Sequence, residues 1–200
     1  MRRRKYVPYG YQNPNRELKY KDTAIAQGNL TTSGEFISLG MVTGGSEVTQ
    51  RVGNKICLKS IKINLAFYTL NNADVIKSTQ ILVMLVMDKF PNNVAYSTTV
   101  PPFLENMADT QSMLSMANRD RFRVLRRWQL LIDGTNGGKR IAQIKKFLRL
   151  GNTEMTFSSN TTTSEATVST NNLFLFIMTS QDNTTILKRD GRARLRYTDS

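Results

Sequence analysis

Five arginines fall within nine positions of residues 118–131, NRDRFRVLRRWQLL, and they alternate with apolar side chains. A guanidinium group is permanently charged, and its fork of donors matches the oxygens of a phosphate or a carboxylate. The chemistry that this segment offers is therefore anion binding. It also carries the only tryptophan of the sequence. The segment is either a nucleic-acid-binding surface or a strand with one wet face and one dry face.

Residues for catalysis are scarce. The sequence has no histidine, which excludes Ser-His triads and most protein-based zinc or copper sites. Its carboxylates are scattered, and GTNGGKR at 134–140 lacks the Ser or Thr that follows the lysine of a phosphate-binding loop. The single cysteine, Cys57, lies in an apolar stretch and is interpreted as a buried thiol. We expect no enzymatic activity, no catalytic residue, no metal and no cofactor.

The charge balance predicts a polyanionic partner. The chain of 200 residues has 28 Lys and Arg against 15 Asp and Glu, a net charge of +13. Nucleic acid is the commonest partner of such a protein. A membrane surface is the alternative, but no basic amphipathic helix and no apolar run long enough to span a bilayer is present, so we expect no membrane insertion.

The first sixteen residues are predicted to form a basic, disordered arm before a folded domain at 17–200. They combine cations with prolines, tyrosines and a glycine, and cannot bury enough apolar area to offset the entropy of ordering. Such an arm reaches phosphates without a fixed register; a solubilising tail is the alternative. RRRK at 2–5 also resembles a weak nuclear import signal, and no apolar signal-peptide core follows it.

The remaining sequence favours an all-β fold of about eight antiparallel strands. In residues 56–70, Ile61, Ile63 and Leu65 alternate with polar side chains, and a change of parity predicts a bulge near Lys59 and Ser60. The one helix candidate is residues 104–117. Two strands, 81–87 and 173–178, are apolar on both faces, so long loops or neighbouring subunits must cover them. We infer an oligomer.

Five motifs carry a family resemblance, and they are ELKYKDT (17–23), RVGNKICLKSIKIN (51–64), NRDRFRVLRRWQL (118–130), LFLFIMTS (173–180) and RLRYTD (194–199). The chain resembles capsid proteins of small, circular, Rep-encoding single-stranded DNA viruses of the circovirus-like or nanovirus-like kind. The resemblance implies one eight-stranded jelly roll of two four-stranded sheets. It also implies a virion shell, a T=1 icosahedron of 60 identical subunits around a single-stranded DNA genome, with assembly in the host nucleus.

Under this resemblance the strands would be B at 18–27 with a continuation at 35–39, C at 55–70, D at 77–88, E at 121–132, F at 140–150, G at 152–158 or 165–170, H at 172–180 and I at 192–198. Many relatives have longer Arg-rich arms. Because the arm of this chain is short, basic residues on the inner wall of the shell are expected to share in neutralising the genome. The residues expected to bind nucleic acid are Arg2, Arg3, Arg4, Lys5, Arg16, Lys19, Lys21, Arg121, Arg123 and Arg127.

Two other functions remain open: a cellular nucleic-acid-binding β-barrel of ribosomal or single-strand-binding type, and an extracellular jelly-roll ligand or lectin.

In the segment at 118–131, one parity holds the apolar residues Phe122, Val124, Trp128 and Leu130. Those side chains are predicted to face the core, and the arginines of the other parity are predicted to face a genome, a neighbour's carboxylates or solvent. Arg126 breaks the pattern through stacking on Trp128, a bend or a bulge.

Overall fold

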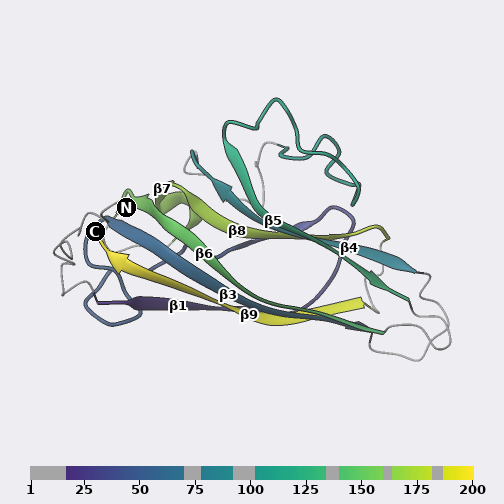
Figure 1. Ribbon diagram of the computed structural model, residues 1–200, viewed down its shortest axis with the longest axis horizontal. Helices are drawn as coiled ribbons and strands as arrows, with labels where there is room; N and C mark the ends of the chain where they lie inside the picture. The colour runs from purple at the N-terminus through teal and green to yellow at the C-terminus, as the bar shows by residue number, and fades with distance from the viewer. Residues whose placement is uncertain (1–16, 70–77, 92–101, 134–139, 160–163, 182–186) are drawn as a thin grey trace, which may run out of the picture.

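Two antiparallel sheets pack face to face in the computed structural model, which describes residues 17–69, 78–91, 102–133, 140–159, 164–181 and 187–200 (Figure 1). The five-stranded sheet has the order β1 (Lys19–Asn29), β9 (Leu187–Asp199), β3 (Lys55–Thr69), β6 (Ile141–Phe157) and β7 (Val168–Thr170). The four-stranded sheet has the order β2 (Glu35–Ser38), β8 (Asn172–Thr179), β4 (Thr79–Asp88) and β5 (Phe122–Ile132). A 3-10 turn, η1 (Glu165–Thr167), precedes β7.

This strand order confirms the jelly roll. Without β7, a three-residue addition at one edge, each sheet has four strands, and the chain crosses between the sheets as a jelly roll does. The lettering of the strands was wrong, however. β2 pairs with β8 in the opposite sheet, so residues 35–39 are strand C and do not continue strand B. The strands predicted as C, D, E and F are therefore D, E, F and G.

Strand β6 joins two predicted strands into one. Residues 140–150 and 152–158 both pair with β3, and the chain kinks between them at Gly151 and Asn152, which have φ of 66° and 62°. On β3 the register shifts between Leu58 and Ser60, which confirms the predicted bulge. Gly151 and Asn152 lie where β6 carries three residues against one on β3, between the pairs Leu58–Thr153 and Ser60–Arg149.

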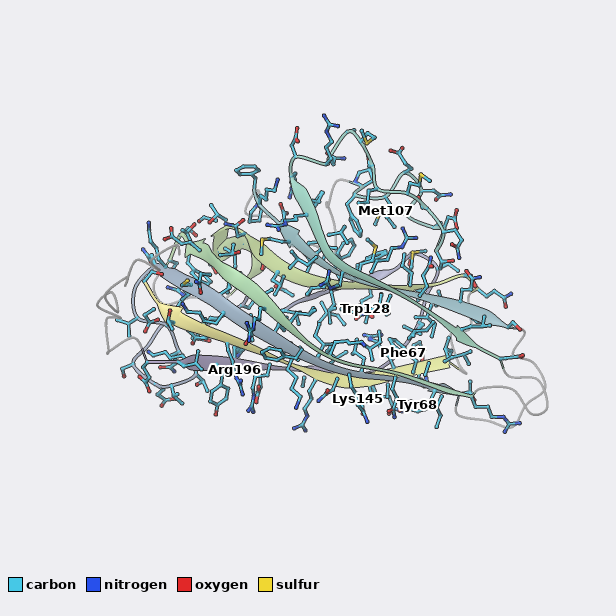
Figure 2. The ribbon with its side chains drawn as sticks, viewed as in Figure 1. Phe67, Tyr68, Met107, Trp128, Lys145 and Arg196 are labelled. Carbon is cyan, nitrogen blue, oxygen red and sulfur yellow. The ribbon has the colours of Figure 1, made fainter. Side chains whose placement is uncertain are left out.

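The main core lies between the sheets, where Phe67 and Trp128 point toward each other's layer (Figure 2). A second apolar cluster lies on the outer face of the four-stranded sheet. There Phe103 and Leu104, from the segment 102–121, pack on Met84 and Phe176 of β4 and β8. The chain's own loop therefore covers the strands that are apolar on both faces, and those strands give no reason to require a neighbouring subunit.

Segment 102–121 is not the predicted helix. Its residues form turns and one isolated bridge between Leu104 and Leu114. Asn106 and Asp109 accept hydrogen bonds from the backbone two residues further on, a local alternative that competes with helical hydrogen bonding. The predicted apolar face is split as a result, because Met107 packs on the second cluster while Met113 is 78% exposed.

A bulge in β5 divides the segment at 118–131 between two cores. Leu85 of β4 pairs with Arg126 and Val86 pairs with Val124, so the residue between them is the extra one. Phe122 and Val124 consequently pack on the outer cluster, whereas Trp128 packs on the main core. The prediction of one apolar face was wrong for Phe122 and Val124, and the bulge is the alternative that holds for Arg126.

Candidate nucleic-acid interface

Arg121 is an anchor of the fold. Its Nε and Nη2 donate to Oδ1 and Oδ2 of Asp88 at 2.9 Å and 2.8 Å, and the Asp88 side chain has no exposed surface. A paired and hydrogen-bonded carboxylate of this kind can be buried without a large penalty. The guanidinium group therefore ties the start of β5 to the end of β4.

Arg127 has a second structural role. Its guanidinium donates to the backbone oxygens of Ser112 at 2.9 Å and Thr110 at 2.8 Å, both in the covering segment 102–121. Carbonyl groups of a loop that is not paired as a strand need such donors for their hydrogen bonds. Arg127 thus holds the cover over the second cluster.

Arg123 lies on the face of β5 opposite to that of Arg127. Its cross-strand neighbour is Met87, a residue of the main core. Together with Arg126 and Arg149 it lines a depression of about 360 Å³ at the open edge between β5 and β6. The prediction that Arg121, Arg123 and Arg127 share one outward face is wrong, because the bulge lies between Arg123 and Arg127 and puts these two residues on opposite faces of β5.

The basic residues near the start of the domain also differ in their surroundings. Lys19 is buried, and its Nζ donates to the Gln50 carbonyl at 3.0 Å and pairs with Asp199 at 2.9 Å. Lys21 is half-buried beside a depression along β1. The predicted arm residues lie outside the described part of the chain, and they are Arg2, Arg3, Arg4, Lys5 and Arg16.

A coherent positive surface lies elsewhere, on the side of the five-stranded sheet that faces away from the other sheet. Its side chains alternate with the core, so Arg192, Arg194 and Arg196 point outward while Ala193 and Leu195 are buried. We call this surface the basic face. Its exposed cations are Lys62, Lys145, Arg149, Arg192, Arg194 and Arg196. Arg196 and Lys145 project from it in Figure 2.

The register brings these cations together. Lys62 lies directly opposite Arg194, and Asn64 lies between Arg192 and Lys145 on the neighbouring strands. Directly opposed side chains in a sheet are about 5 Å apart, and like charges at that spacing destabilise the pair. A bound polyanion would relieve this repulsion.

Among the described residues, the carboxylates of Asp22 and Asp190 lie beside these cations, and Asp22 is paired with Arg194. Arg194 donates from Nε and Nη2 to the oxygens of Asp22, both at 2.6 Å, and its guanidinium lies 4.6 Å from the centre of the Tyr20 ring. The hydrogen bonds from Arg194 hold the pKa of Asp22 below its ordinary value. Both partners are nearly half exposed, so solvent screens the pair and it adds little to stability.

The basic face is hollowed along β9 and β3. One depression of about 290 Å³ is lined by Lys62, Arg192, Arg194 and Arg196, and another of about 320 Å³ by Lys145 and Arg192. Both share Asn64 and Arg192. Cations around shallow hollows suit a flexible chain of phosphates better than a small molecule that must be enclosed.

The structure offers little for other chemistry. No group of three His, Cys, Asp or Glu side chains in the described residues is placed to hold a metal ion. Cys57 is half-buried, whereas a buried thiol was predicted. No helix in the described ranges is long and apolar enough to cross a membrane.

Residues 1–199 match the model of the geminivirus coat protein/nuclear export factor BR1 family. The chain belongs to that family. It is therefore related to viral capsid proteins, as the motifs indicated, but to those of geminiviruses and not to the circovirus-like or nanovirus-like group.

Individual members of the family show the same relationship. The capsid protein of tomato yellow leaf curl Sardinia virus (isolate Spain-1) is 29% identical over 159 residues, covering 76% of this chain and 58% of the relative. The capsid protein of African cassava mosaic virus (isolate Nigerian) is 35% identical over 116 residues, which is 54% of this chain and 43% of the relative. The matches thus cover 58% and 43% of the lengths of these two capsid proteins.

Among solved structures, desmodium yellow mottle tymovirus matches with 14% identity and a TM-score of 0.34, covering 91% of this chain and 87% of the other. The Gx strain of infectious bursal disease virus matches with 11% identity and a TM-score of 0.32, covering 92% and 32% of the two chains.

None of the cations of the basic face was among the residues predicted to bind nucleic acid. Their signal was the alternation itself, as in RARLRY (192–197), where every second residue is an arginine and the intervening residues are Ala, Leu and Tyr. The register between β3 and β6, which places Lys145 and Arg149 beside them, is a long-range property that a local pattern does not give.

Proposed function

We propose that this chain is a capsid protein whose copies assemble into a closed icosahedral shell and package single-stranded DNA. The smallest shell, with T=1 and 60 copies, suits a subunit of one compact jelly roll. The observation that carries the proposal is the basic face, six exposed cations on one side of one sheet. This side would line the shell and contact the genome.

The proposed mechanism is electrostatic. Each cation that meets a phosphate releases a counterion, so affinity falls as salt rises, with a slope of about −0.7 per contact on a single strand. Phosphate contacts carry no base information, so binding is independent of sequence. The predicted arm, with Arg2, Arg3, Arg4 and Lys5, precedes β1, which pairs with β9 from Lys19 and Tyr197 onward. The arm would add its charge to a sheet that already carries the basic face.

The proposed locations are the virion and, during assembly, the host nucleus. The family description includes a nuclear export factor, and the RRRK stretch at 2–5 would serve import. Single-stranded DNA and identical subunits are the proposed partners, without a cofactor.

A cellular nucleic-acid-binding protein is the second candidate. One observation favours it, namely that segment 102–121 covers the outer face of β4 and β8 within a single chain. Such a protein would bind DNA in the same way but would form no particles.

Neutralising the centre of the basic face should weaken DNA binding about 25-fold at 0.1 M salt, because two phosphate contacts are lost. The variant is Arg192→Gln/Arg196→Gln, chosen because both side chains are exposed and project from the surface of the sheet. We expect the slope of log affinity against log salt to become shallower by about 1.4. Fluorescence anisotropy with a labelled single strand across a salt series measures both.

The matched control is Lys89→Gln/Arg119→Gln, which removes the same charge beside the covering segment and should change affinity less than twofold. Asp22→Asn should act in the opposite direction, because it removes an acid and releases Arg194, with about fivefold tighter binding. An equal loss in the control and in the basic-face variant would show that only net charge matters.

A further inference from the structure

We propose that Phe147 is a stacking platform for an unpaired base, which makes the basic face selective for single strands over duplex. The inference rests on the proposed function, since it concerns how the same face holds nucleic acid. The ring of Phe147 is a large apolar group on a charged surface. Phe147 is 55% exposed in the middle of β6, on the basic face, where its neighbours Lys62, Lys145 and Arg149 are charged.

Cations surround the ring on three sides. Lys62 lies directly opposite Phe147 on β3, and Arg194 is the next residue across the sheet in the same row. Lys145 and Arg149 are two positions away along β6, so they share its face at a spacing of about 7 Å. A strand whose phosphates bind these side chains would place its bases next to the ring of Phe147.

A π face is available only from an unpaired base, because the bases of a duplex already stack on one another. Stacking of a base on an aromatic side chain works with every base, so it adds affinity without sequence preference. The cations would hold either form of DNA through its phosphates, and the ring would add affinity only for the single strand. The chemistry recognised is therefore a phosphodiester chain with free bases.

A second copy of this chain is the other partner that an exposed ring could meet. Charge argues against a contact between two basic faces, because it would bring two sets of cations together at short range. Phe147 also has no exposed aromatic companion at either adjacent position of the same face of β6. A polyanion that carries its own aromatic groups complements both the charge and the ring.

The test compares three probes of about 20 nucleotides in length, an oligothymidylate, an abasic strand with the same phosphates, and a duplex. We expect Phe147→Ala to weaken binding of oligothymidylate about tenfold and to change binding of the abasic strand and the duplex less than twofold. Phe147→Trp should keep the preference for oligothymidylate. Ile141→Ala is the matched control, because Ile141 is 54% exposed on the same strand and face and should change none of the three.

Equal weakening of all three probes by Phe147→Ala, or no weakening at all, would overturn the stacking role. So would a change in the sedimentation of the DNA-free protein without a change in the ratio between probes, which would assign Phe147 to a contact between copies. If the unaltered chain bound none of the probes, the proposed packaging function itself would fall. The outcome for the parent chain therefore separates the two claims.

Discussion

Replacing Phe103 with alanine should lower the free energy of unfolding by about 3–5 kcal/mol, the cost of emptying a well-packed aromatic site. Phe103 is 2% exposed, and its ring centre lies 5.0 Å from that of Phe176, 5.8 Å from Phe122 and 6.1 Å from both Phe36 and Phe174. It is the aromatic residue that segment 102–121 contributes to the second cluster, beside Leu104 and Met107. Urea unfolding, followed by tryptophan fluorescence, measures the change.

Phe90→Ala is the matched control, because that ring is 61% exposed and its removal should cost less than about 0.5 kcal/mol. The Phe103 variant should also bind a dye that reports apolar surface, since loosening the segment uncovers β4 and β8. A loss as small as that of the control would mean that segment 102–121 does not stabilise the sheet beneath it.

Removing the Asp88 carboxylate should have a comparable effect. Asp88→Ala leaves the charge of Arg121 without its buried partner, and breaking a buried pair from one side costs about 3–5 kcal/mol. It also removes the oxygen that accepts from the backbone of Phe90 at 3.1 Å. The free energy of unfolding in urea is again the measurement.

Two further variants identify the cause. Asp120→Ala removes a fully solvated carboxylate near Arg119, and we expect a change below about 0.5 kcal/mol. Asp88→Ala/Arg121→Met removes both charges and should be more stable than Asp88→Ala alone, because no unpaired charge remains. If the double variant were the less stable one, the apolar stem of Arg121 would matter more than its charge.

Local patterns in the sequence were sufficient for the fold class. Strict alternation in β3 and β9 predicted strands with one buried face, and the parity change near Lys59 predicted its bulge. The pairing of strands was harder. β2 has four residues and is separated from the end of β1 by only five residues, so nothing local separates a continuation of the same strand from a crossing to the other sheet.

The functional surface was predicted only in part. The arginines of 118–131 stood out because they are close in sequence, yet Arg121 and Arg127 are held by Asp88 and by loop carbonyls. Those partners lie on other elements, so the sequence gives no sign of them. The basic face combines residues from β3, β6 and β9, and only the register of the sheet brings them together.

The central claim is that copies of this chain close into a shell around nucleic acid, and negative-stain electron microscopy of the purified chain tests it most directly. We predict uniform closed particles that release single-stranded nucleic acid when they are disrupted. A soluble monomer at micromolar concentration and physiological salt, with bound DNA but no particles, would contradict the shell and favour the cellular nucleic-acid-binding protein.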